Sequence, residues 1–152
     1  MKNWRSLLIS MGLLVVATSM AWGQSNTTLD KILAGKAASF ADAAYLVLTA
    51  TKKIPDSATL TEAADAVATQ NWGIKPSQAD QPLTLGTYSF MLMKAFKMHG
   101  GIMYTLFPGP RYAARELVYL GDIHGDTSPY RTLSGTEAVN ILGSVLNQQE
   151  GS

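Results

Sequence analysis

The side chains most able to do chemistry lie in a short segment bounded by Gly121 and Gly125. Asp122 and His124 lie within it, and Asp126 continues the alternation just after Gly125. Carboxylates and imidazoles in one loop are ligands for calcium or zinc. The loop lacks the glutamate and the spacing of an EF-hand, and Asp122 with His124 supplies fewer ligands than the three or four that a transition metal requires. We therefore expect an ordinary solvated turn here, with no bound metal and no cofactor.

The same five residues are identical to the first metal-binding motif of the calcineurin-like metallophosphoesterases. This resemblance implies a metal-dependent hydrolase built on Asp122 and His124. That family also needs segments similar to Gly-Asp-x-x-Asp and Gly-Asn-His and several more histidines, whereas His99 is the one other histidine of this chain. The family places its motif after a strand, and a helical pattern precedes it here. The hydrolase is therefore the weakest of the functions that we consider.

The residues needed for nucleophilic catalysis are missing from the sequence. The chain has no cysteine, its two histidines lie far apart, and no serine stands in a Gly-x-Ser-x-Gly elbow. We therefore expect a protein that is not an enzyme. The lack of cysteine also excludes disulfides, zinc–thiolate sites and a lipid-modified cysteine, and an exported domain without disulfides is typical of the bacterial periplasm.

A second resemblance covers more of the chain. Residues 117–125 read Leu-x-x-x-Gly-x-Ile-x-Gly, and they are followed by Tyr130 and by Leu-Ser-Gly-Thr-Glu-Ala at residues 133–138. This arrangement resembles the S-layer homology domain, whose unit is a helix, a Gly-x-Ile-x-Gly loop, an aromatic residue near a proline and a second helix opened by Thr-Arg-Ala-Glu. Here Pro129 precedes the aromatic residue instead of following it. Fainter similarity extends to residues 39–42, 61–64 and 83–84.

This resemblance implies a helical fold more strongly than it implies carbohydrate binding. In S-layer homology domains the arginine of Thr-Arg-Ala-Glu helps to bind acidic cell-wall polysaccharide, but Gly135 stands at that position here and Leu85 in the earlier unit. Arginines near the loops could restore the positive charge. A tryptophan exposed in a loop is often a contact at an interface or a sugar-stacking surface. The candidate binding residues are therefore Trp72, Arg111, Tyr130 and Arg131.

Apolar residues recur at helical spacing in five segments, and each segment follows a residue able to begin a helix. Three of these starts have the sequence of a capping box, in which two side chains satisfy free backbone amides of the first turn. The boxes pair Ser39 with Asp42, Thr59 with Glu62, and Ser134 with Glu137. The sequence predicts an all-α bundle of about five short helices, at residues 39–51, 60–70, 85–98, 111–120 and 134–147.

Residues 85–98 are apolar on too many sides to face water, which is typical of a central core helix. Residues 102–107 read as a buried connector. We expect the methionine and aromatic side chains of residues 90–107 to pack in the core, and an apolar pocket or partner interface is their alternative role. A shift of the chain by 50 residues places Thr84 on Ser134 and predicts two helix–loop–helix units similar to S-layer homology repeats.

The first residues predict export. Lys2 and Arg5 precede an apolar run that is short for a membrane span, and Ala21-Trp22-Gly23 fits a signal-peptidase site, so we expect cleavage before Gln24. An uncleaved amphipathic anchor is the alternative. The remaining 129 residues carry ten basic and eleven acidic side chains, without the basic stripe that nucleic acid requires. The expected organisation is a signal peptide at residues 1–23, a lead-in at 24–38, one helical domain at 39–147 and a flexible tail at 148–152, with no transmembrane segment in the mature chain.

These features predict an exported, non-catalytic binding or scaffolding module of the bacterial periplasm or cell envelope, which docks on cell-wall polymer or on an envelope protein. The alternative is an accessory subunit of a larger periplasmic assembly, with the methionine and phenylalanine side chains as its interface. A metal-dependent hydrolase that uses Asp122 and His124 is the third possibility. The sequence does not indicate an oligomeric state.

Overall fold

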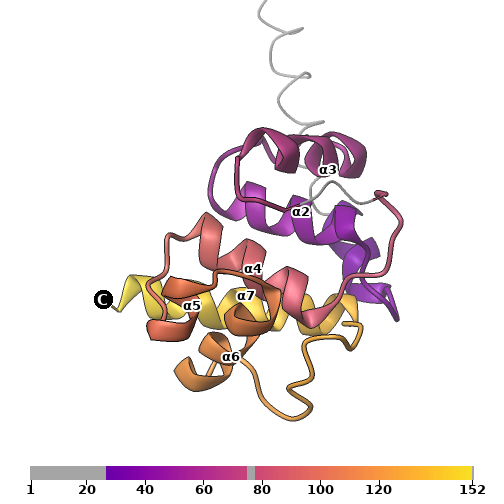
Figure 1. Cartoon of the computed structure of the whole chain (residues 1–152). Helices are drawn as coiled ribbons and strands as arrows, with labels where there is room; N and C mark the ends of the chain where they lie inside the picture. Colours follow the sequence, from indigo (N-terminus) through magenta and orange to yellow (C-terminus); the bar gives the residue numbers. More distant parts are fainter. Residues whose placement is uncertain (1–26, 75–77, 152) are drawn as a thin grey trace, which may run out of the picture.

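The computed structural model describes residues 27–74 and 78–151 (Figure 1). The expected signal peptide and its cleavage site before Gln24 lie outside these residues. Within them the chain is helical and contains no strand, which confirms the all-α prediction. Residues 27–34 are helical, and the helices that follow are α2 (Phe40–Ala50), α3 (Leu60–Thr69), α4 (Leu85–Ala95), α5 (Ile102–Leu106), α6 (Pro110–Leu120) and α7 (Gly135–Glu150).

The helix starts follow the local chemistry of the sequence. Ser39 and Thr59 form the predicted capping boxes at α2 and α3. Hydrogen bonds from the backbone and the hydroxyl of Thr59 hold the pKa of Glu62 below its ordinary value. At α7 the box is half formed: Ser134 accepts a hydrogen bond from the Glu137 amide, but the Glu137 carboxylate pairs with an arginine instead of returning to the cap.

Three helices, α2, α4 and α7, begin at one centre, where the residues just before them are joined in a ring of hydrogen bonds. The Ala38 amide donates to the Leu133 carbonyl (2.7 Å), the Leu133 amide to the Leu83 carbonyl (3.3 Å), and the Leu83 amide to the Ala38 carbonyl (2.9 Å). A second set of three backbone hydrogen bonds surrounds this ring. Its donors are the amides of Phe40, Leu85 and Gly135, and its acceptors are the carbonyls of Gln81, Arg131 and Gly35, respectively. The centre therefore has approximate threefold symmetry.

The core is built around α4, as predicted from its apolar sequence. Tyr88, Met91 and Leu92 are fully buried, and the Tyr88 hydroxyl donates to the Ala138 carbonyl of α7 at 2.8 Å. Burial raises the pKa of the Tyr88 hydroxyl far above its ordinary value, so it remains a donor. In Figure 1, α3 covers α2 on one side of α4, and α5 and α6 lie on the other.

Several predicted boundaries need correction. The core helix α4 ends at Ala95 instead of residue 98, because Lys97 adopts a left-handed conformation (φ 52°) that a helix cannot continue. Residues 27–34, assigned to the lead-in, are helical. The last helix continues to Glu150 instead of ending near residue 147, and its Gln148 side chain donates to the Leu120 carbonyl. No helix of the described ranges is long and apolar enough to cross a bilayer.

Candidate functional site

The glycine-bounded segment after α6 contains one buried carboxylate, contrary to the expected solvated turn. Gly121 ends α6 in the left-handed conformation (φ 84°), and the turn carries Asp122 inward, where 5% of its surface is exposed. Its Oδ1 accepts a hydrogen bond from the Ser144 hydroxyl of α7 at 2.7 Å. Burial raises the pKa of Asp122, while the Ser144 hydrogen bond and the nearby His124 act in the opposite direction.

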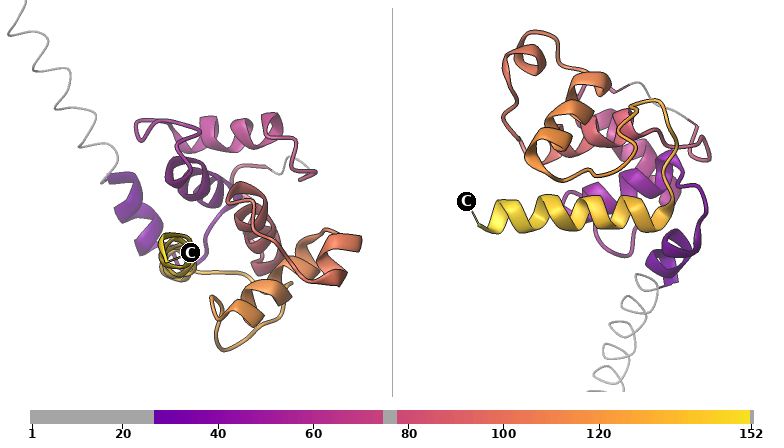
Figure 2. Two further views of the ribbon diagram at one scale, coloured as in Figure 1. Left: turned by 90° about the vertical axis from the view of Figure 1, so that its left-hand side faces the viewer. Right: turned by 90° about the horizontal axis from the view of Figure 1, so that it is seen from below.

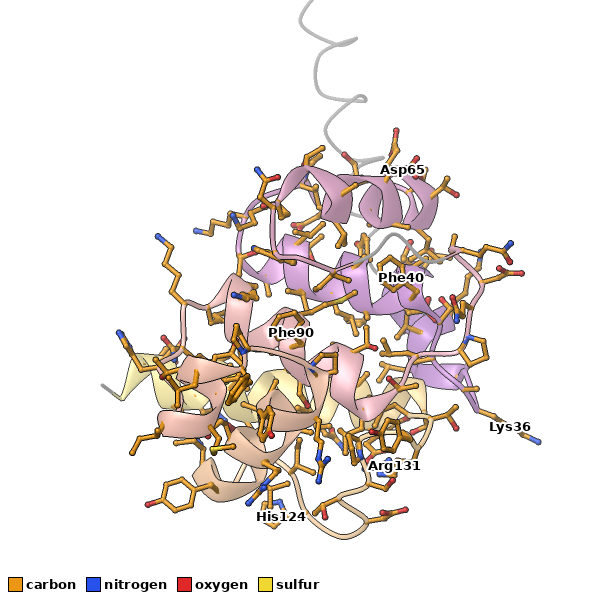
Figure 3. All side chains as sticks on the ribbon, in the orientation of Figure 1. Lys36, Phe40, Asp65, Phe90, His124 and Arg131 are labelled. Carbon is orange, nitrogen blue, oxygen red and sulfur yellow. The ribbon has the colours of Figure 1, made fainter. Side chains whose placement is uncertain are left out.

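A hollow of about 270 Å³ lies beside this carboxylate, between the turn and α7. It is lined by Asp122, Ile123, His124, Glu137, Asn140, Ile141 and Ser144. The second oxygen of Asp122 is buried and has no hydrogen-bond partner among the described residues. His124 and Asp126 remain exposed, and His124 lies at the outer edge of the molecule (Figure 3). Asp122 therefore ties the loop to α7.

The described residues contain no group of three or more histidine, aspartate and glutamate side chains placed to hold a metal. Glu137 lines the hollow, but Arg131 engages both of its carboxylate oxygens, one of them at 2.9 Å. The geometry therefore gives no support to the hydrolase that the Asp122 and His124 motif suggests.

The four candidate binding residues do not form one site. Trp72 is half-buried against the core, contrary to the predicted exposure, and the Lys53 ammonium lies 5.9 Å from its ring centroid. Arg131 is engaged by Glu137. Arg111 is exposed on α6, and Tyr130 is exposed in the loop before α7 (78% of its surface). The structure thus leaves Arg111 and Tyr130 exposed, and the residues just before them, Pro110 and Pro129, both lie close to Gly86 at the start of α4.

The residue that follows each of the three capping residues at the centre is buried, so a charged side chain would not fit there. Phe40 and Leu85 are buried at this position in α2 and α4, and Gly135 is buried in α7. A Cβ atom at Gly135 would lie 1.6 Å from the Ile32 carbonyl oxygen. An arginine at these positions, which S-layer homology domains use for polysaccharide, would therefore require the centre to open.

An exposed apolar surface on α5 is the feature that sequence reasoning missed. Residues 102–107 were expected to be a buried connector, but the exposed fractions are 78% for Ile102, 46% for Met103, 63% for Leu106 and 60% for Phe107. We call these four side chains the α5 surface. Its sequence signal is a short apolar segment between two glycines and the Pro-Gly-Pro turn, which is too short to enter and leave a core already filled by α4.

The single buried side chain of α5 fixes it to the body. Tyr104 is 8% exposed and packs edge-on against Phe90 of α4, with ring centroids 6.3 Å apart. A Cβ atom at Gly100 would lie 2.5 Å from the Tyr104 ring, so the chain approaches this ring closely. Burial and the nearby Glu116 carboxylate raise the pKa of Tyr104, which keeps the anchor neutral. The α5 surface is therefore held outward by a defined contact.

The expected core role of the methionine and aromatic side chains is thus correct for α4 and for Tyr104, and wrong for Met103 and Phe107. Phe90, Met91 and Met93 are buried, whereas Met103 and Phe107 face outward.

Comparisons with protein families, with curated proteins and with solved structures find no match for this chain.

Proposed function

We propose that this chain is an exported, non-catalytic docking module of the bacterial cell envelope, and that it binds another envelope component through the α5 surface. The exposure of Ile102 and Leu106 on one short helix and of Phe107 just after it carries this proposal. Large apolar side chains gathered on a surface are typical of interaction sites. Burying each fully contributes about 1.5–3 kcal/mol, so a small patch supports reversible attachment.

Two further observations favour apolar docking over recognition of an acidic polymer. The buried positions at Leu85 and Gly135 leave no room for the polymer-binding arginine of S-layer homology domains. Arg131, a candidate for replacing that charge, is committed to Glu137. The resemblance to that family supports a location at the envelope. The alternative role expected for the Met and Phe side chains, that of an interface, supports docking through apolar contacts.

Sedimentation with isolated bacterial envelopes tests this function. Purified protein starting at Gln24 is expected to pellet with the envelopes, and Ile102→Ser with Leu106→Ser to reduce the pelleted fraction at least about fivefold, because both apolar contacts are lost. The double variant Leu29→Ser, Leu33→Ser removes two partly exposed leucines elsewhere and is the matched control. Equal pelleting of the two double variants, with unchanged circular dichroism, would refute docking through α5.

A further inference from the structure

The charges of the described chain are unevenly distributed along the sequence, and the most basic segment is the one that contains α5. Residues 94–120 contain four basic side chains, Lys94, Lys97, Arg111 and Arg115, and one acidic side chain, Glu116. Residues 121–151 contain Arg131 as their one basic side chain and four acidic ones, Asp122, Asp126, Glu137 and Glu150. The segment that carries the exposed apolar helix is thus the cationic part of a molecule whose remainder is acidic.

These cations flank α5 on both sides along the chain. Lys97 is exposed in the turn before α5. Arg111 and Arg115 are one turn apart on α6, which packs against α5, and both are exposed. The Lys94 ammonium, near the end of α4, lies 5.3 Å from the Phe90 ring centroid. Basic side chains therefore lie before and after α5 along the chain, and the Glu116 carboxylate of α6 lies beside Gly101 at the start of α5.

The α5 surface also lies at the periphery of the molecule. Figure 2 shows α5 projecting at one end, whereas residues 27–34 lie at the opposite end in both views. The α5 surface can therefore approach a large flat partner without obstruction from the start of the described chain.

We propose that the envelope component bound by the α5 surface is a membrane whose lipid headgroups are negatively charged. This inference rests on the proposed function and names its partner. Ile102, Leu106 and Phe107 enter the boundary between headgroups and acyl chains, while Lys97, Arg111 and Arg115 remain among the anionic headgroups. Apolar side chains beside Lys and Arg are the composition of segments that lie in a membrane interface, and juxtamembrane cations add electrostatic attraction.

The small size of the apolar surface favours a membrane over a protein partner. A stable protein interface buries about 800 Å² and about 20–30 residues on each side. The α5 surface consists of four side chains, three on a single short helix and one, Phe107, at its end. A fluid bilayer accepts such a tip without a shaped complementary surface, and charge strengthens the attachment.

Vesicle binding tests the inference separately from the proposed function. The probes are vesicles of equal parts phosphatidylglycerol and phosphatidylcholine, and vesicles of phosphatidylcholine alone. We expect purified protein starting at Gln24 to bind the anionic vesicles and to bind the neutral ones at least about tenfold more weakly, since each cation near an anionic surface contributes about a fivefold change. High salt should weaken the binding to anionic vesicles.

The variants separate the apolar and the charge contributions. Ile102→Ser with Leu106→Ser should abolish vesicle binding, and Arg111→Gln with Arg115→Gln should weaken binding to anionic vesicles at least about tenfold. The matched control is Lys31→Gln with Lys36→Gln, which should bind normally: both lysines are exposed, Lys31 lies within residues 27–34, and Lys36 lies at the edge of the molecule (Figure 3). Circular dichroism verifies that each variant is folded.

The outcomes distinguish the docking function of the α5 surface from the identity of its partner as an anionic membrane. If the protein pellets with envelopes through α5 but does not bind anionic vesicles, the lipid inference is wrong and the docking function stands, with a protein or polymer partner. Equal binding to neutral and anionic vesicles also overturns the inference. If neither envelopes nor vesicles are bound, both proposals are wrong.

Discussion

Asp122 is the residue whose environment departs most from its sequence context. Its neighbours Gly121, Gly125 and Asp126 are exposed, yet its own carboxylate is buried against Ser144. Gly121, just after α6, adopts a left-handed conformation that other residues rarely adopt. This conformation turns the chain inward. The alternation of acidic residues in the sequence indicated metal ligands or a solvated turn, and neither alternative included a structural carboxylate bonded to a helix 22 residues later.

The raised pKa of Asp122 makes a prediction about stability and pH. A carboxyl whose pKa is raised by folding contributes stability below its ordinary value of 3.8, and this contribution is lost as the pH rises through the folded pKa. Asp122→Asn keeps an acceptor for Ser144 and removes the charge. We expect the variant to be more stable than the wild type near neutral pH, and the difference to vanish in acid.

Urea unfolding at a series of pH values measures this difference. Asp126→Asn is the matched control, since the Asp126 side chain is exposed in the same loop. If Asp122→Asn is less stable than the wild type at neutral pH, or if the difference does not depend on pH, then the buried carboxylate is not a cost to the fold.

At the scale of the elements, the sequence predicts what is decided locally. The starts of α2, α3, α4 and α7 are confirmed at their predicted residues, because a capping side chain acts on amides within its own first turn. Thr84 and Ser134, which the shift by 50 residues aligns, both cap helices that begin at the common centre.

The third capping residue at the common centre, Ser39, could not be found by shifting the sequence by a fixed number of residues. Ser39 lies 45 residues before Thr84, whereas Ser134 lies 50 residues after it, so one shift aligns a single pair. The exposure of α5 was equally hidden, because a run of apolar residues contains no periodicity that separates an inner from an outer face. The contact of Tyr104 with Phe90 decides that question, and it is tertiary.

The close approach at the start of α7 makes a prediction about two glycines of one helix. Gly135→Ala would place a Cβ 1.6 Å from the Ile32 carbonyl oxygen and displace residues 27–34, so it should cost about 2–4 kcal/mol. Gly143→Ala, with nothing within 4 Å of its Cβ, should be neutral or stabilise by up to about 1 kcal/mol. Thermal unfolding compares them, and equal effects would mean that the two segments are not packed as described.

At the scale of the whole molecule, the structure combines a rigid centre with an outward-facing tip. The ring of hydrogen bonds holds α2, α4 and α7 together, and Tyr104 attaches α5 to this framework. A tip held in this way presents its apolar side chains before any partner arrives. Such preorganisation lowers the entropy lost on binding. The central claim is therefore that the α5 surface becomes buried when the protein docks on the envelope.

The absence of cysteine allows a direct measurement of that burial. A single cysteine at position 106 (Leu106→Cys) or, as control, at the exposed Ala68 of α3 (Ala68→Cys) can be labelled with a polarity-sensitive fluorophore. When isolated envelopes are added, we expect the emission of the label at position 106 to shift to shorter wavelength and that at position 68 to remain unchanged. If the protein binds the envelopes but the emission of the label at position 106 does not shift, the α5 surface stays in water and the account is contradicted.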